Sequence, residues 1–190
     1  MKWLFGKITD PTPQEYAAWE KALSPSRGAR IRRLQKEEDR CRSLLATRLV
    51  HRLLSESGYP DGTLENEPDG RPYLSGCPLQ VSISHCDEGV VCAVSSHAVG
   101  IDLEKLRPVP LSLIRYVCTE EEQRYILESD STTEDGTVDG VAAHRFWSVW
   151  TAKEAYFKKN GCSHADIRSI HTLPLPKHRV CVEDYVITVV

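Results

Sequence analysis

The alternation of apolar and polar residues divides the chain into predicted strands and helices. A first strand is expected at 2–8, and short alternating or apolar runs predict further strands at 72–74, 79–84, 89–95, 99–103, 178–182 and 185–190. Apolar residues at helical spacing predict helices at 12–23, between 25 and 57, at 119–129 and at 141–160.

Start and stop signals support these boundaries. Thr12–Glu15 and Thr119–Glu122 have the pattern of capping boxes, and Ser24-Pro25 is a further helix start. Helix ends are indicated by Gly58 and Gly161. The polar stretches 59–70 and 131–139 are expected to be loops, and Glu183-Asp184 to turn a terminal hairpin.

The order strand, helices, strands, helices, strands predicts an α+β protein. Its element order suggests two similar α/β halves related by a pseudo-twofold, although no residue-level repeat is visible. A linker-like change of composition at 105–110 divides the chain into halves of 1–107 and 108–190.

Composition narrows the class of protein. The 190 residues are 41% hydrophobic and 27% charged, as in ordinary soluble domains. Neither a membrane-length apolar stretch nor a secretory leader is present, so the cytoplasm is the expected compartment. The seven cysteines include no Cys-x-x-Cys pair, which argues against a disulfide framework or a zinc knuckle.

Charge is unevenly distributed around a net value of −3. Nine basic and three acidic residues lie between Arg27 and Arg52, whereas eight acidic residues and one arginine lie between Glu120 and Asp139. The basic stretch indicates either a polyanionic partner or an ordinary solvated helix face. It lacks interleaved aromatic residues, which argues against a single-stranded nucleic-acid platform.

Two acidic clusters carry candidate chemistry. Asp102 and Glu104 alternate on a strand, so their carboxylates point the same way and can share a hard cation. Glu154 and Lys158 are neighbours on one helix face. A third carboxylate from this helix would complete a set of oxygen ligands for Mg²⁺, as used with phosphate esters.

Each cluster also has a structural explanation. Asp102 and Glu104 fit the polar end of a buried strand, and Glu154 and Lys158 fit an exposed helical ion pair. By the same argument, Lys153 and Lys159 are surface charges. A buried glutamate or lysine, in contrast, is rarely present without a partner or a function. Burial of this helix is favoured by the aromatic residues on several of its sides, which are Phe146, Trp147, Trp150, Tyr156 and Phe157.

Three further residues could face a phosphate. Ser84 and His85 end an alternating strand, where a hydroxyl and a ring nitrogen could bind an anion or serve the structure alone. Arg71 begins the strand that Pro72 enters, although a loop arginine is usually solvated.

Together these residues resemble a known family. Gly100-Ile101-Asp102-Leu103-Glu104 and Trp150-Thr151-Ala152-Lys153-Glu154-Ala155, followed by Lys158, resemble the two signature motifs of the 4′-phosphopantetheinyl transferases. Gly70-Arg71-Pro72, Ser82-Ile83-Ser84-His85 and the stretch from Ser24 to Arg42 are similar to further motifs of its surfactin-synthetase-activating type. The resemblance covers roughly residues 1 to 170.

The resemblance implies an activity and its partners. It implies transfer of phosphopantetheine from coenzyme A to a serine of an apo acyl or peptidyl carrier protein, with release of 3′,5′-ADP. It also implies a monomer of two fused halves with the active site in the cleft between them, acting in fatty-acid, polyketide or nonribosomal-peptide biosynthesis, with neither a nucleic-acid nor a membrane partner.

The matching positions imply a role for each residue. Asp102, Glu104 and Glu154 would hold Mg²⁺, for which Mn²⁺ can substitute, and Glu154 would help deprotonate the serine. Lys158 would neutralise or protonate the leaving phosphate. The phosphates and the adenosine of coenzyme A would contact the remaining candidates, which are Arg42, Arg71 and His85, with Ser84, Arg27 and Arg30 as weaker ones.

The chain departs from the family pattern at two places. Arg71 stands where lysine is usual, and Val117-Cys118-Thr119 replaces a Phe-Ser-like segment, which puts carrier docking in question more than catalysis. Two other function classes stay open: another metal-dependent phosphoester enzyme, such as a hydrolase, and a non-catalytic module that binds coenzyme A or a carrier protein.

Overall fold

The structure is a computed structural model that describes residues 1–8, 13–21, 23–128, 133, 136–161 and 166–190. By compactness the chain divides into two units, Met1–Val99 and Gly100–Val190. The strand that bears Asp102 and Glu104 thus belongs to the second unit, whereas the sequence placed it at the end of a first half of 1–107. Its position is set by pairing with the C-terminal strand, which composition near 105–110 does not reveal.

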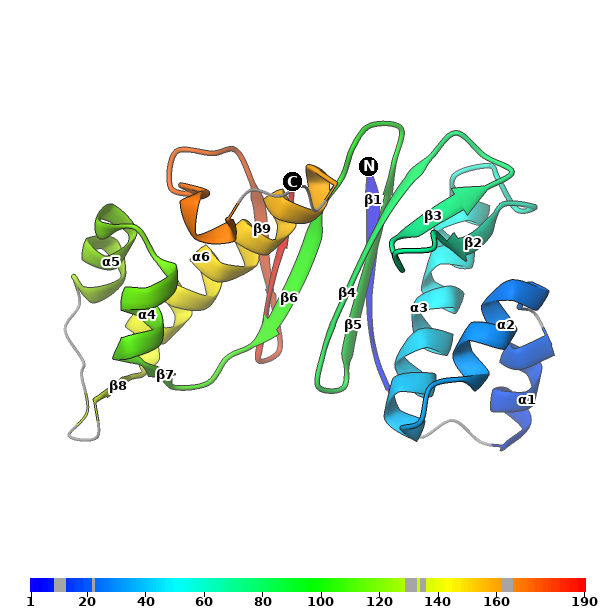
Figure 1. Cartoon of the computed structure of the whole chain (residues 1–190), viewed down its shortest axis with the longest axis horizontal. Helices are drawn as coiled ribbons and strands as arrows, with labels where there is room; N and C mark the ends of the chain where they lie inside the picture. The colour runs from blue at the N-terminus through cyan, green and yellow to red at the C-terminus, as the bar shows by residue number, and fades with distance from the viewer. Residues whose placement is uncertain (9–12, 22, 129–132, 134–135, 162–165) are drawn as a thin grey trace. The chain divides into compact units, whose positions relative to one another are not determined.

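The first unit is built on a three-stranded antiparallel sheet in the order β1-β5-β4 (Figure 1). Its strands are β1 (Lys2–Lys7), β4 (Gln80–Cys86) and β5 (Gly89–Ser95). The 20-residue helix α3 (Glu37–Glu56) packs on β5 and β1. Smaller elements complete the unit: α1 (Pro13–Lys21), α2 (Pro25–Arg32), β2 (Thr63–Asn66) and β3 (Pro72–Ser75).

The core of the first unit lies between α3 and the sheet. Leu45, Val50 and Leu54 on the helix meet Val90, Cys92 and Val94 on the central strand. The three strand residues alternate, as expected for one face of a strand. This face of the sheet therefore stabilises the unit by burial of apolar side chains.

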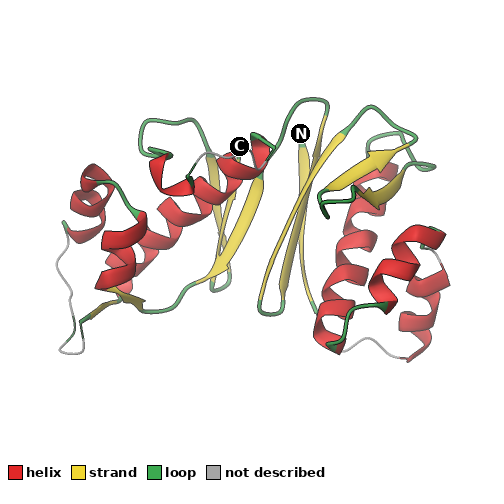
Figure 2. Cartoon of the chain, viewed as in Figure 1, coloured by secondary structure: helices red, strands yellow, loops and turns green. Residues whose placement is uncertain are grey.

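The second unit contains a second three-stranded antiparallel sheet, in the order β6-β10-β9. Its strands are β6 (Ile101–Lys105), β9 (His178–Val182) and β10 (Tyr185–Val189). The 20-residue helix α6 (Gly140–Lys159) packs on β6 and β10, and Figure 2 shows it beside these strands. The remaining elements are β7 (Val109–Pro110), α4 (Leu111–Val117), α5 (Glu120–Leu127), β8 (Thr137–Val138) and the 3₁₀ turn Ile167–Ser169.

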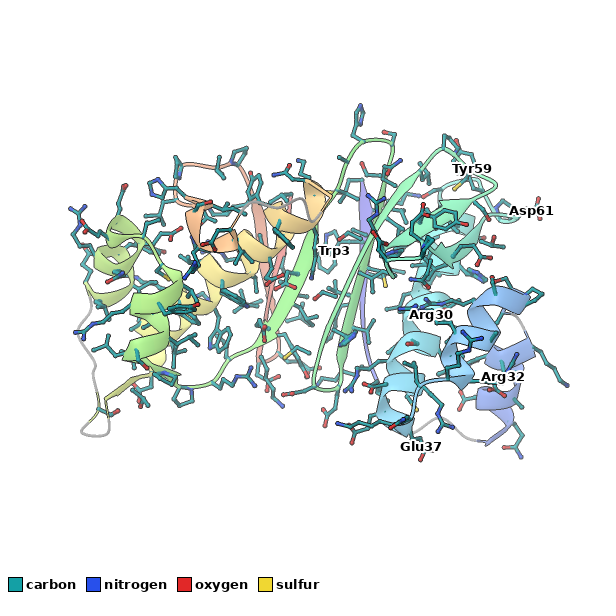
Figure 3. The ribbon with its side chains drawn as sticks, viewed as in Figure 1. Trp3, Arg30, Arg32, Glu37, Tyr59 and Asp61 are labelled. Carbon is teal, nitrogen blue, oxygen red and sulfur yellow. The ribbon has the colours of Figure 1, made fainter. Side chains whose placement is uncertain are left out.

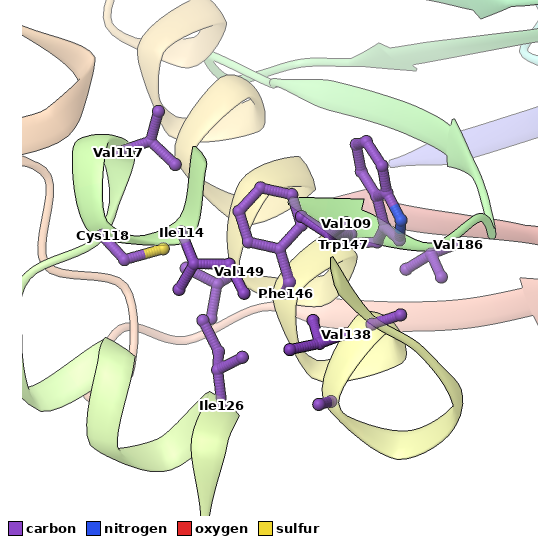
Figure 4. Close-up of a cluster of buried hydrophobic side chains, with 12 residues drawn as sticks. Val109, Ile114, Val117, Cys118, Ile126, Val138, Phe146, Trp147, Val149 and Val186 are labelled. Atoms are coloured by element: carbon purple, nitrogen blue, oxygen red, sulfur yellow. The ribbon is translucent and has the colours of Figure 1, made fainter. Parts of the chain in front are cut away.

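A cluster of buried apolar residues joins α4, α5 and α6 to β10 (Figure 4). Phe146 and Trp147 of α6 belong to this cluster, with ring centroids 5.0 Å apart in an edge-to-face arrangement. These contacts pack one side of α6 against the rest of the unit. The residues at the C-terminal end of α6 therefore lie on a helix that is fixed in place by packing.

Most of the predicted elements are confirmed, and the α+β class with them. The capping box of Thr119 and Glu122 forms in both directions, and Gly58 and Gly161 follow their helices with positive φ. The capping-box residue Thr12 and the cysteine Cys162 lie outside the described residues, and the other six cysteines are free. The pseudo-twofold and the cleft stay predictions.

Two predictions of local structure are wrong. The stretch 59–70 is not wholly a loop, because β2 pairs with β3. Within 131–139, Thr137 and Val138 form β8 and pair with β7. The helical structure predicted between 25 and 57 is confirmed and consists of two helices, α2 and α3, separated at 33–36. In the described part of the chain, no helix combines the length and the apolarity needed to cross a membrane.

Candidate active site

The second unit gathers the predicted carboxylates on the face of its sheet that meets α6. Asp102 and Glu104 lie opposite Thr188 and Val186 in the antiparallel register of β6 and β10. The side chain of Asp102 is buried and that of Glu104 is partly buried. Their spacing of two residues puts both on one face of the strand, as the sequence predicted.

Helix α6 brings Lys158 against this strand. The Lys158 Nζ donates to Asp102 Oδ1 at 2.6 Å and lies 3.4 Å from the carbonyl oxygen of Ile101. The Asp102 side chain is 6% exposed and that of Lys158 is 24% exposed, so solvent screens this ion pair less than a surface pair. The structure therefore places a cation and a carboxylate in direct contact at the centre of the candidate site.

Glu154 is the third carboxylate of the group. Burial raises its pKa, and the negative charges of Asp102 and Glu104 raise it further, while Lys158 acts in the opposite direction. This mutual influence shows that the strand carboxylates and Glu154 share one neighbourhood. A raised pKa makes Glu154 a stronger proton acceptor than an ordinary glutamate.

The donor set suits Mg²⁺ in its chemistry, because all three candidate ligands offer carboxylate oxygens and a cation would relieve their repulsion. The side chains of Asp102, Glu104 and Glu154 are nevertheless not arranged as a set of metal ligands in this structure. Across the described segments, no three His, Cys, Asp or Glu side chains form a group that could hold a metal ion. In this arrangement the ammonium of Lys158 supplies positive charge to Asp102.

Arg107 is a charged neighbour that the sequence did not single out. Its Nη2 lies 3.6 Å from Glu104 Oε2, and its guanidinium stacks 5.0 Å from the centre of the Trp147 ring. The backbone of Arg107 also accepts a hydrogen bond from Trp147 Nε1 at 2.9 Å. No local spacing rule signals this contact, because Glu104 lies on a strand, where residues three apart point to opposite faces, and Arg107 follows that strand.

Lys153 is buried, which excludes the surface-charge explanation and agrees with the burial that the aromatic residues of this helix favoured. Its side chain is 0% exposed, and its Nζ lies 2.9 Å from Oε2 of Glu122, which is also 0% exposed. Burial acts to raise the pKa of the Glu122 carboxyl, but hydrogen bonds from Lys153, Thr172 and Thr119 outweigh it and lower that pKa. The signature pair Lys153-Glu154 therefore divides into one buried anchor and one candidate ligand.

In the first unit, Arg27 is held by protein partners. Its side chain is buried, donates through Nε to Thr47 Oγ1 at 3.2 Å and contacts the side-chain oxygen of Asn66. Burial lowers the pKa of Arg27. These contacts give Arg27 a structural role, between α2, α3 and β2.

Arg42 and His85 lie in one neighbourhood. Arg42 Nη1 donates to the carbonyl oxygen of Asp87 at 2.9 Å, and Nη2 pairs with Asp39. The hydrogen bond from Arg42 lowers the pKa of Asp39, and His85 lowers it further. An anion that reached this part of α3 and β4 would thus meet Arg42 and His85, and it would compete with Asp39 for Arg42.

The other candidates of the first unit are also placed. Arg30 is exposed on α2, where Figure 3 labels it beside Arg32, and a Cβ added to Gly70 would stand 3.3 Å from its Nη2. Arg71 is exposed directly after Gly70. Ser84 is buried on β4. The structure thus brings Arg30 to the turn that precedes Arg71.

Gly100 belongs to the first signature motif, and the structure explains why a glycine is needed at this position. A Cβ built on it would overlap the carbonyl oxygen of Ala155 and stand 2.9 Å from the backbone nitrogen of Lys159. The backbone of α6 therefore lies directly on the start of β6. This close approach is what allows Lys158 to reach Asp102.

Comparison with known proteins finds a matching family model and several similar proteins. Residues 98–188, which include β6 and α6, match the model of the 4′-phosphopantetheinyl transferase superfamily. The chain is 29% identical over 143 residues to the 4′-phosphopantetheinyl transferase Sfp of Bacillus subtilis (strain 168), a match that covers 73% of this chain and 60% of that protein.

Two other relatives give a similar result. The 4′-phosphopantetheinyl transferase gsp of Aneurinibacillus migulanus is 31% identical over 128 residues, which cover 65% of this chain and 50% of that protein. The 4′-phosphopantetheinyl transferase pptA of Paxillus involutus is 27% identical over 150 residues, covering 70% and 57%. The chain spans about half to three fifths of the length of these relatives.

Proposed function

The chain belongs to the 4′-phosphopantetheinyl transferase superfamily, and we propose that it transfers 4′-phosphopantetheine from coenzyme A to a serine of an apo carrier protein. The observation that carries this proposal is the contact of Asp102 with Lys158 beside Glu154, all within the residues that match the family. The other two function classes lack a comparable observation.

The reaction is a phosphoryl transfer. The serine oxygen attacks the phosphorus that bears pantetheine, one P–O bond forms, and the P–O bond to 3′,5′-ADP breaks. Catalysis of such a step rests on positioning and on neutralising charge. Asp102, Glu104 and Glu154 would hold Mg²⁺, or Mn²⁺ in its place, which when bound would neutralise charge on the pyrophosphate.

Glu154 and Lys158 act on the two ends of the reaction. Glu154 lies near Asp102, Glu104 and Lys158, and its carboxylate oxygen would accept the proton of the serine hydroxyl, directly or through a water molecule. Lys158 provides an ammonium group that would neutralise or protonate the leaving phosphate oxygen. Asp102 orients this ammonium group before the reaction, because it accepts a hydrogen bond from it.

The first unit would bind coenzyme A. Arg42, Arg71 and Arg30 offer exposed or partly exposed cationic side chains and His85 offers ring nitrogens, and arginine suits phosphate because its planar fork donates two parallel hydrogen bonds. Arg27 and Ser84 are buried. We therefore propose that Arg27 stabilises the elements that carry the other basic residues, and that Ser84 is a weaker contact to coenzyme A. We also propose that the protein is a monomer and that it acts in the cytoplasm.

A mass measurement tests the transfer. The chain is incubated with coenzyme A, Mg²⁺ and apo carrier proteins of fatty-acid, polyketide and peptide synthesis, and each carrier is weighed. A mass gain of one phosphopantetheine that EDTA abolishes supports the proposal, and failure on every carrier would sink it. A hydrolase would instead consume coenzyme A without a carrier.

A variant tests the metal side of the site. Asp102→Ala is expected to lower the rate of transfer roughly a hundredfold or more, because it removes a metal ligand and the partner of Lys158. It is also expected to lose the rise in melting temperature that Mg²⁺ produces in the unaltered chain. Near-normal transfer by a folded Asp102→Ala protein would overturn the metal assignment.

A further inference from the structure

The turn of α6 around Glu154 is anchored on both sides of that residue. Three positions before it, Thr151 Oγ1 lies 2.8 Å from Thr188 Oγ1, and both residues are 0% exposed. One position after it, Ala155 lies against Gly100. The remaining neighbour, Lys153, forms the anchor with the largest number of polar contacts.

The ammonium of Lys153 contacts three acceptors from two segments. It pairs with Glu122 Oε2 of α5 at 2.9 Å, donates to the carbonyl oxygen of Arg168 at 3.2 Å, and donates to the carbonyl oxygen of Ile170. An ammonium group has three N–H donors, so these acceptors satisfy it fully. A buried charge of this kind persists only when its partners are in place.

Glu122 extends the anchor to further residues. Its Oε1 accepts from the backbone nitrogen of Thr172 at 3.0 Å and from Thr172 Oγ1 at 2.9 Å, and its Oε2 accepts from the backbone nitrogen of Thr119 at 2.9 Å. The Lys153 side chain thus connects α6 to the start of α5 and to the segment 168–172. A rotation of α6 would break several of these hydrogen bonds together.

We propose that Lys153 is a positioning residue, which holds α6 at the rotation that directs Glu154 toward Asp102 and Glu104. The inference rests on the proposed function. Adjacent residues on a helix are separated by a fixed rotation, so the orientation of Lys153 sets that of Glu154. A displacement of about 1 Å in a catalytic group can cost roughly a hundredfold in rate.

Two variants separate positioning from a purely structural role. Lys153→Met with Glu122→Gln leaves neither buried charge, so the double variant is expected to recover most of the stability that Lys153→Met alone loses. It nevertheless lacks the donors for Arg168 and Ile170. Its kcat should therefore fall roughly tenfold or more, while KM for coenzyme A stays within about twofold.

Glu122→Gln alone is the matched control. It keeps Lys153 with both backbone acceptors and an amide oxygen, so its stability should fall while its kcat stays within about twofold of the unaltered chain. If the double variant does not fold, Glu122→Gln still puts the inference at risk, because a tenfold lower kcat in this folded variant would contradict it.

A double variant with normal kcat would show that Lys153 is only structural, and a tenfold lower kcat in folded Glu122→Gln would contradict positioning by the Lys153 hydrogen bonds. An unaltered chain that modifies no carrier would overturn the proposed function, and with it this inference.

Discussion

The two units have the same connectivity and use it differently. In each, the first strand lies at one edge of a three-stranded antiparallel sheet, a 20-residue helix follows later in the unit, and the last strand is central: β1, α3, β4, β5 in one and β6, α6, β9, β10 in the other. The difference lies on the sheet face that meets the long helix.

In the first unit this face serves packing. Leu4, Cys92 and Ile83 lie side by side across β1, β5 and β4, and all belong to or pack against its apolar cluster. In the second unit, Asp102 and Thr188 occupy neighbouring positions on β6 and β10, with Lys158 above Asp102. The comparison teaches that one arrangement of strands and helix can carry either an apolar core or the buried charges of a candidate site on this face.

Exchanging the two kinds of residue is expected to give the largest effect. Leu4→Asp removes apolar packing and brings a carboxylate against α3, so it should cost about 4 kcal/mol of unfolding free energy. Asp102→Leu removes one partner of a largely buried ion pair but leaves Lys158, which is 24% exposed and can turn toward solvent, so it should cost less, about 2 kcal/mol, while abolishing transfer.

Urea unfolding of both proteins measures this contrast. Equal losses of stability in the two variants would show that the sheet face of the second unit also depends on its polar residues for folding. The comparison between a packing face and a functional face would then fail.

A glycine in each unit sharpens the comparison. Gly100→Ala forces a Cβ into the backbone of α6 at Ala155 and should cost about 3 kcal/mol, at the upper end for overpacking. Gly6→Ala is the matched control on β1, because its Cβ would meet Leu45 Cδ1 at an ordinary 3.4 Å. Chemical denaturation of both variants checks the prediction, and a Gly6→Ala loss as large as that of Gly100→Ala would contradict it.

The predictable part of the site follows from local rules. Alternation along β6 put Asp102 and Glu104 on one face, and helical spacing made Glu154 a neighbour of Lys158. The capping box at Thr119 likewise fixed the start of α5, because its hydrogen bonds join residues three apart.

The unpredicted part depends on contacts between distant residues. Lysine is rarely buried, so its residue type alone predicts that Lys153 is exposed. The partner that allows its burial, Glu122, lies on another helix. The pairing of β6 with β10, which assigns Asp102 to the second unit, joins opposite ends of that unit. Strands β2, β7 and β8 are too short to show a period and exist only through their partners.

The smallest expected effect is a difference in pH dependence between two carboxylates, one in each unit. Because the folded state raises the pKa of Glu154, it binds this proton more tightly than the unfolded chain does. Stability is therefore lost as pH rises from about 4.3, the unfolded value, through the raised folded pKa. Glu154→Gln removes this loss and should be more stable than the unaltered chain at pH 7, by less than about 1 kcal/mol after allowance for solvent screening.

Asp39 in the first unit gives the opposite sign. The hydrogen bond from Arg42 lowers its pKa, so its contribution to stability is present above the unfolded pKa of about 3.9 and is lost as pH falls through the folded value. Asp39→Asn should therefore be less stable than the unaltered chain at pH 7, with a difference that shrinks in acid. Unfolding midpoints in urea between about pH 3 and pH 7 would measure both variants. Differences of the same sign would mean that the second unit does not hold Glu154 among repelling carboxylates, and the distinction between the two units would lose its electrostatic basis.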